Sequence, residues 1–296
     1  MVLGVVVAVF YEPSLVSLGG LPRLVLAVFA TCLVASSNYV LNEILDGRTD
    51  AEHPLKKHRP VPSGRVRIPL AYGEWLLLAA AGFALGFYIN APFGLAAVSL
   101  WVMGTFYNVP PIRTKELPYV DVITESVNNP IRLLLGWFAL IDNRLPPLSL
   151  LLSYWALGAF FMGTKRFAEL RMIGDRTRAA SYRRSFVHYT EDNLLVSMFF
   201  YMAACAFFGG IFMVRCKLEL VLFVPFAAGM FALYLRLGLK PDSPVQNPER
   251  LHRERGFFAY TVACFVLFVL LMFTRIPALY AWFEFDPPKA PALWVF

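Results

Sequence analysis

The feature that most constrains this chain is a series of apolar stretches, each long enough to cross a lipid bilayer. About 20 helical residues, at about 1.5 Å of rise per residue, span a hydrocarbon core of about 30 Å. Candidate spans lie at 22–45, 70–89, 92–108, 119–141, 148–170, 193–214, 218–238 and 256–274. The sequence therefore predicts an all-α polytopic membrane protein.

The composition agrees with this fold class. Hydrophobic residues make up 58% of the chain and charged residues 16%, whereas soluble domains carry roughly 45–50% and about 25%. These values exclude a disordered chain, a soluble nucleic-acid binder and a disulfide-stapled secreted module, so no nucleic-acid partner is expected. The four cysteines form no CxxC pair and the four histidines no HExxH motif, so neither a redox site nor a zinc site is expected.

The N-terminal stretch is apolar from Met1 to Phe10, but Glu12 and Pro13 interrupt it. Ten helical residues cover only about 15 Å, half of the hydrocarbon core. We interpret it as a truncated first helix of a protein with about nine transmembrane helices. A cleaved signal peptide is the alternative, but the stretch lacks a basic n-region and a small-residue cleavage site.

Basic residues are concentrated in alternate connections between the candidate spans. The segments 46–67, 165–184 and 236–255 and the loop near 113 together hold 20 of the 27 lysines and arginines. Because cytoplasmic loops of membrane proteins are enriched in these residues, the four connections are predicted to face the cytoplasm. They are also the long connections, which places the candidate chemistry on that side.

Three polar residues, Asn42, Asp46 and Asp50, recur every fourth position at the end of the second span. Each step of four turns a helix by only about 40°, so the three side chains share one stripe, about 6 Å apart along the axis. Amide and carboxylate oxygens suit Mg²⁺, which shares a few protein ligands with substrate phosphates. We therefore predict that all three are metal ligands and catalytic residues; a solvated helix end is the alternative.

The segment that follows, 53–65, is strongly basic. It contains Lys57 and Arg59, and a metal with nearby cations can hold a diphosphate and neutralise its developing charge as a leaving group. An ordinary cytoplasmic loop with a positive charge excess is the alternative interpretation.

Taken together, Asn42-x3-Asp46-x3-Asp50 and the Lys57–Gly64 segment resemble the first signature of the UbiA-type membrane prenyltransferase superfamily. The segment from Tyr107 through Arg113, Lys115 and Asp121 to Arg132 and Gly136 is similar to the family's connection between helices four and five. The resemblance implies a single domain over 1–296, with helices around a central cavity open to the cytoplasm and to lipid. It also implies that Mg²⁺ activates a diphosphate, which Arg113 and Lys115 help to bind.

A third segment, Gly163–Leu170 with Ser185–Thr190, resembles the decaprenyl-phosphate phosphoribosyltransferase branch. That resemblance implies phosphoribosyl diphosphate as donor and a polyprenyl phosphate lipid as acceptor. Lys165 and Arg166 are expected to bind phosphate, and Glu169 to contact ribose hydroxyls or orient a cation. Quinone prenyltransferases carry a second aspartate-rich motif here, which only Glu169 and Asp175 could echo. The resemblance adds Tyr189 as a substrate-binding candidate, and as secondary candidates Glu43 (where the branch usually has Asp), Tyr107, Asp121, Arg132 and Asp175.

Two other functions stay open at this level. A prenyltransferase acting on an aromatic or quinone precursor needs the same first motif, and a non-catalytic transporter would also contain polar residues within its spans. A transporter is expected to carry its acidic residues near the bilayer midplane, whereas Asp46 and Asp50 lie at the end of a predicted helix. The expected location is the bacterial cytoplasmic (inner) membrane, in contact with membrane lipid and with the active site facing the cytoplasm; a homo-oligomer is compatible with the sequence.

Overall fold

The computed structural model describes the chain apart from residues 16–19, 52–55, 176–178, 180–182, 247 and 284–296. The regular elements of the described residues are all helices, which confirms the all-α part of the predicted fold class. The α-helices are α1 (Val2–Tyr11), α2 (Gly20–Ala51), α3 (Ile68–Ile89), α4 (Ala91–Asn108), α5 (Val120–Phe138), α6 (Leu148–Ile173), α8 (Glu191–Cys216), α9 (Val224–Gly238), α10 (Arg255–Phe273) and α11 (Pro277–Phe283).

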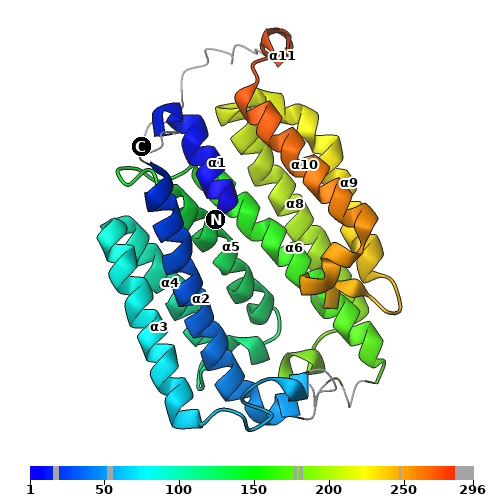
Figure 1. The fold of residues 1–296 in the computed structure, drawn as a ribbon. Helices are drawn as coiled ribbons and strands as arrows, with labels where there is room; N and C mark the ends of the chain where they lie inside the picture. Colours follow the sequence, from blue (N-terminus) through cyan, green and yellow to red (C-terminus); the bar gives the residue numbers. More distant parts are fainter. Residues whose placement is uncertain (16–19, 52–55, 176–178, 180–182, 247, 284–296) are drawn as a thin grey trace, which may run out of the picture.

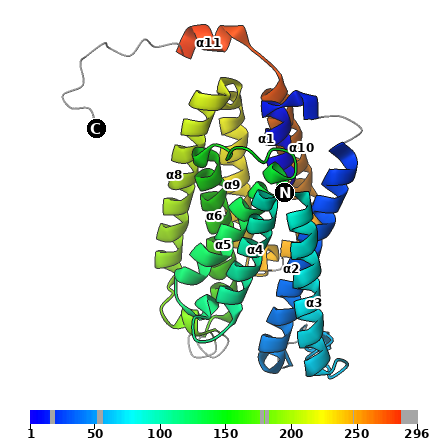
Figure 2. The same cartoon turned by 90° about the vertical axis from the view of Figure 1, so that its left-hand side faces the viewer.

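The long helices run up and down in one bundle, and α11 lies across its upper end (Figures 1 and 2). Short 3₁₀ helices lie in the lower half of the bundle in Figure 1, which we call the basic end. They are η2 (Lys56–His58), η3 (Thr114–Glu116), η4 (Arg184–Val187) and, below α9, η6 (Pro244–Gln246) and η7 (Pro248–Arg253). The first part of the predicted basic segment, 53–55, lies outside the described residues. The basic end therefore carries the connections that the charge pattern singles out.

Among the described residues, five segments are long and apolar enough to cross a membrane: Gly20–Arg48, Ile68–Ile89, Glu191–Cys216, Leu218–Gly238 and Arg255–Phe273. The predicted spans at 92–108, 119–141 and 148–170 are also helical, as α4, α5 and α6. Helices α5 and α6 are less apolar because they carry the buried charges of the site, including Asp121 and Arg166. Polar side chains in a membrane helix normally face the protein interior, which fits the central position of this pair in Figure 1.

Two boundaries differ from the prediction. The stretch 218–238 is a 3₁₀ helix, η5 (Leu218–Phe223), followed by α9, because Pro225 lacks a backbone N–H and favours the first turn of a new helix. Helix α2 continues to Ala51, about six residues beyond its predicted apolar part. The polar stripe is thus on a continuous helix.

Small residues let the central helices approach closely. A Cβ added at Gly4 of α1 would lie 2.0 Å from the Leu133 carbonyl oxygen of α5, and one at Gly136 of α5 would lie 2.0 Å from the Met1 carbonyl oxygen. This glycine pair packs the short α1 against α5, as small residues do between membrane helices. The predicted N-terminal stretch is therefore a packed helix.

Candidate active site

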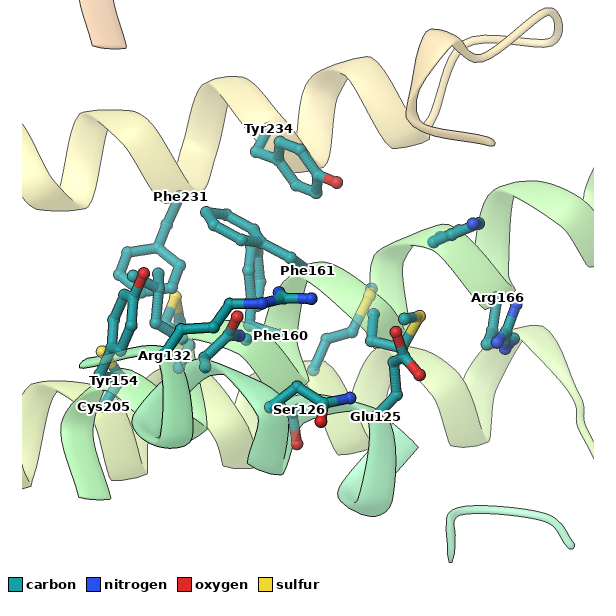
Figure 3. Close-up of a pocket in the computed structure, with 18 of the residues that line it drawn as sticks. Glu125, Ser126, Arg132, Tyr154, Phe160, Phe161, Arg166, Cys205, Phe231 and Tyr234 are labelled. Carbon is teal, nitrogen blue, oxygen red and sulfur yellow. The ribbon is translucent and has the colours of Figure 1, made fainter. Parts of the chain in front are cut away.

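A large cavity lies among α2, α4, α5, α6, α8, α9 and α10, with a volume of about 2580 Å³. Ordinary small-molecule sites occupy about 300–1,000 Å³, so this cavity has room for two substrates. Its wall toward the basic end is polar, whereas aromatic side chains such as Phe160, Phe161 and Phe231 line the part shown in Figure 3. The cavity therefore combines a charged compartment with an apolar one.

The three residues of the predicted stripe, Asn42, Asp46 and Asp50, all line this cavity. Asp50 is buried and forms an ion pair with Arg59, whose Nη1 lies 2.9 Å from the Asp50 Oδ2. The geometry thus brings the stripe and one residue of the basic segment together. Lys57, in contrast, is exposed on η2 and is not part of the cavity wall.

Lys115 places an ammonium group among the oxygens of the stripe. Its Nζ lies 2.5 Å from Asp46 Oδ1, 2.9 Å from Asn108 Oδ1 and 3.4 Å from Asn42 Oδ1. Burial lowers the pKa of Lys115, and the Asp46 carboxylate opposes that shift. Arg113 adds a second cation, with its Nη2 3.1 Å from the same Asp46 oxygen.

The backbone around η3 is strained where it presents these cations. Arg113 and Tyr119, which flank η3, have positive φ angles of 28° and 63°. Side-chain-bearing residues rarely adopt such angles, and they are concentrated at functional sites. The loop therefore holds its two basic residues toward α2 at a conformational cost.

This oxygen set fits a magnesium ion that is shared with a substrate. Two amide oxygens and one carboxylate oxygen already surround a cation, the Lys115 ammonium. Among the described residues, no group of three or more His, Cys, Asp or Glu side chains could hold a metal alone. Mg²⁺ usually keeps several waters and binds through one or two carboxylates plus substrate phosphates. The donor set therefore suits a metal–diphosphate complex better than a closed protein cage.

A second polar cluster is built around Arg166 on α6. Its Nε lies 2.9 Å from Asp121 Oδ2 of α5 and its Nη1 lies 2.7 Å from Glu169 Oε2, while Nη2 donates to the Tyr107 hydroxyl at 3.2 Å. Arg166 is 2% exposed and Asp121 is fully buried. We call Arg166, Asp121, Glu169, Tyr107 and Tyr189 the Arg166 cluster. Two carboxylates already neutralise this guanidinium, so phosphate binding by Arg166 stays a prediction that must compete with them.

Tyr189 completes the cluster from the connection before α8. Its hydroxyl donates to Asp121 and accepts a hydrogen bond from the Tyr119 backbone N–H at 2.7 Å. Burial and the Asp121 carboxylate raise the pKa of the Tyr189 phenol. Neither Tyr189 nor Asp121 lines the cavity, so in this structure both position other side chains.

The remaining candidates separate into cavity residues and supporting residues. Lys165 and Arg132 line the cavity, and neither forms a hydrogen bond or ion pair with the described chain. The Glu43 Oε1 accepts a hydrogen bond from the Val61 backbone N–H at 2.8 Å and so ties the basic segment to α2. Asp175 is exposed just beyond the end of α6 and is not in the wall.

Two residues of the cavity wall, Asn108 and Arg183, were not predicted from the sequence. Asn108 supplies an oxygen to Lys115, and Arg183 donates to the Tyr107 hydroxyl at 2.7 Å and to the Lys115 carbonyl at 2.8 Å. Asn108 follows the motif residue Tyr107 and is the last residue of the apolar helix α4. A polar residue at this position could have been recognised as a site candidate from the sequence. Arg183 belongs to a run of basic residues in which nothing local distinguishes it.

Comparisons with known proteins agree with this arrangement. Residues 1–262 match the UbiA prenyltransferase family. The solved structure of a UbiA homolog from Archaeoglobus fulgidus bound to GPP and Mg²⁺ has a TM-score of 0.66 at 17% identity and covers 94% of each chain. The fold is therefore shared with that structure.

Two groups of curated relatives are similar in sequence. The decaprenyl-phosphate phosphoribosyltransferase of Corynebacterium glutamicum is 29% identical over 178 residues, which cover 57% of this chain and 49% of that protein. Its Mycobacterium tuberculosis counterpart is 30% identical over 175 residues, 59% and 55% of the two chains. The chain thus spans about half the length of these relatives. The protoheme IX farnesyltransferase of Leptospira interrogans is 22% identical over 264 residues and 83% of each chain.

Proposed function

Because this chain belongs to the UbiA prenyltransferase family, we propose that it is a magnesium-dependent membrane transferase of the phosphoribosyl type. It moves a 5-phosphoribosyl group from phosphoribosyl diphosphate onto a polyprenyl phosphate. The names of the relatives at 29–30% identity support this choice of substrates. The charge pattern of the loops supports a location in the bacterial inner membrane, with the basic end at the cytoplasm.

The observation that carries the proposal is the charge of the cavity wall. Among its described lining residues, eight are basic and five are acidic. Phosphoribosyl diphosphate and polyprenyl phosphate both bring phosphate groups into this space, and each phosphate monoester carries about −1.5 to −2 charges at pH 7. An excess of cations in a low-dielectric cavity matches such a pair of substrates.

The residues have distinct roles in the transfer. The bond between C1 of the ribose and the diphosphate breaks, pyrophosphate departs with the electron pair, and an oxygen of the lipid phosphate forms the new bond to C1. Asn42, Asp46, Asp50 and Asn108 would hold Mg²⁺. When bound, this ion neutralises and orients the diphosphate as a leaving group.

The cations of the wall support the same step. Lys115 and Arg113, which pair with Asp46 in this structure, lie where they can contact the diphosphate oxygens and stabilise their developing charge. Lys165 lines the cavity, forms no ion pair within the described part of the chain and is available to the acceptor phosphate. That phosphate is already ionised at neutral pH, so the reaction needs no dedicated general base.

A radiochemical transfer assay tests the proposal. Purified protein in lipid nanodiscs is given Mg²⁺, polyprenyl phosphate and ribose-labelled phosphoribosyl diphosphate, and we expect label in the lipid phase. Asp46→Ala should lower this transfer by about a hundredfold or more, the usual loss at a charge-stabilising site. Full activity of Asp46→Ala, or no lipid product from the wild-type protein, contradicts the proposal.

The second candidate is transfer of a prenyl group from a prenyl diphosphate onto an aromatic or quinone precursor. The similarity to protoheme IX farnesyltransferase over 83% of the chain favours it. In a parallel arm of the assay, prenyl diphosphates replace the ribose donor and an aromatic acceptor replaces the lipid phosphate. Turnover confined to this arm would establish the second candidate and reject the first.

A further inference from the structure

Arg132 is a charged residue inside the cavity for which the proposed reaction has not yet supplied a role. It lies twelve residues after Val120, the first residue of α5, or about 18 Å along the helix. Its side chain is exposed to the cavity, and Figure 3 shows it running along the cavity beside Phe160 and Phe161. A charged group at this depth is costly, and such residues usually mark a binding or transport function.

No acid of the described chain neutralises this guanidinium. The other arginines that line the cavity each form an ion pair, but Arg132 forms neither an ion pair nor a hydrogen bond among the described residues. Glu125, two turns earlier on α5, also lines the cavity and forms no ion pair with it. The guanidinium is therefore exposed in the cavity without an acidic partner in the described chain, and it is available to an anionic ligand.

Uncharged polar groups surround the same position. Asn129 is one turn before Arg132 on α5, and Tyr154 faces it from α6, with its hydroxyl in the cavity (Figure 3). The neighbouring Asn128 also lines the cavity and contributes a second amide to this group.

The close approach of α6 to α5 fixes this group of residues. A Cβ added at Gly158 would lie 1.7 Å from the Asn129 Nδ2, so the Asn129 amide packs directly on the α6 backbone. Tyr154 is one turn from Gly158, and its hydroxyl therefore lies at the level of Arg132. The donors available here are a guanidinium, an amide N–H₂ and a phenol hydroxyl, which together suit a phosphate oxyanion.

We propose that Arg132, with Asn129 and Tyr154, forms a subsite for a phosphate monoester of a substrate, separate from the diphosphate site at Asp46. This proposal rests on the proposed function and extends it. Two phosphates have the required chemistry: the phosphate of the polyprenyl acceptor and the 5-phosphate of the ribose donor. A prenyl diphosphate with an uncharged aromatic acceptor would leave this subsite empty.

Binding of substrate fragments distinguishes the two sources without requiring turnover. Wild-type protein and Arg132→Gln are compared in their affinities for polyprenyl phosphate against polyprenol, and for ribose 5-phosphate against pyrophosphate. We expect Arg132→Gln to weaken either polyprenyl phosphate or ribose 5-phosphate by about 10- to 100-fold, the range for a lost charge-assisted hydrogen bond. Polyprenol and pyrophosphate, which lack the relevant monoester, should bind as before.

Control variants keep the result interpretable. Arg215→Gln removes an exposed arginine at the far end of α8 and should leave all four affinities unchanged. Arg132→Lys keeps the charge and should recover part of the affinity, and Tyr154→Phe should cost several-fold; melting curves identify any variant that fails to fold. Unchanged affinity for both phosphate probes in folded Arg132→Gln overturns the subsite. If wild-type protein binds the fragments through Arg132 but transfers no phosphoribose, the proposed function fails and the subsite stands.

Discussion

The neighbouring residues Lys165 and Arg166 should respond in opposite ways to substitution by methionine. Arg166 is 2% exposed and holds Asp121 and Glu169 together, with N–O distances of 2.9 and 2.7 Å. Lys165 lines the cavity and has no hydrogen bond or ion pair in the described chain. The first cation therefore supports the fold, whereas the second is available for substrate.

The expected loss of folding stability depends on whether a substitution leaves a buried charge without its partner. Arg166→Met leaves two buried carboxylates without their main partner, although Tyr189 and Arg183 still contact Asp121. Removing one member of a buried ion pair costs about 3–5 kcal/mol, or roughly 6–20 °C in melting temperature at about 2–4 °C per kcal/mol. Lys165→Met leaves no buried partner unpaired, so its cost should stay within about 1 kcal/mol.

Thermal unfolding with and without ligand is the assay. Both variants are purified in the same detergent, and their melting temperatures are measured alone and with polyprenyl phosphate. We expect Arg166→Met to lower the melting temperature strongly. Lys165→Met should leave it nearly unchanged while it reduces the stabilisation by the lipid. Equal melting temperatures for the two variants, or full lipid stabilisation of Lys165→Met, would refute the division of roles.

Further predictions test the fold and the supporting residues. Gly158→Ala forces a methyl group against Asn129 and should lower the free energy of unfolding by about 1–3 kcal/mol. Gly210→Ala is the control, because a methyl group there meets open space, and it should not destabilise the protein. Equal losses of stability in the two variants would contradict the close packing at Gly158. Glu43→Ala should speed amide exchange of the basic segment, and Glu43→Gln, which keeps an acceptor oxygen, should not. Tyr189→Phe should lower stability by about 1–3 kcal/mol. Because the pKa of Tyr189 is raised above the unfolded value of 10.0, folding stability falls as pH rises past 10. Tyr189→Phe should lose this component, and identical pH profiles would contradict the assignment.

Local spacing was enough to predict which candidate residues of one helix share a face. The interval of four between Asn42, Asp46 and Asp50 fixes a shared face on any α-helix, and the structure places all three on the cavity wall. The all-helical fold follows similarly from the length of the apolar stretches. The break before α9 was also visible in principle, because Pro225 disfavours a continuous helix.

Pairings between distant segments were not predictable from the sequence. Lys165 and Arg166 are adjacent basic residues at the end of a span, and only the packing of α5 on α6 shows that one of them is enclosed by Asp121 and Glu169. The contact of Lys115 with Asn108 likewise depends on how η3 folds back onto α4. The sequence shows which residues are charged, but which oppositely charged residue each one contacts depends on the tertiary structure.

The central claim is that the oxygens around Lys115 bind a metal–diphosphate complex. Isothermal titration of pyrophosphate into the protein, with and without Mg²⁺, tests it directly. We predict that pyrophosphate binding by the wild-type protein requires Mg²⁺. In the wild-type structure the Asp46 carboxylate lies 2.5 Å from the Lys115 ammonium. Replacing this carboxylate in Asp46→Asn should weaken the affinity for Mg²⁺–pyrophosphate by about tenfold or more. Binding of equal strength without Mg²⁺, or an Asp46→Asn variant that binds as tightly as wild type, would contradict the account.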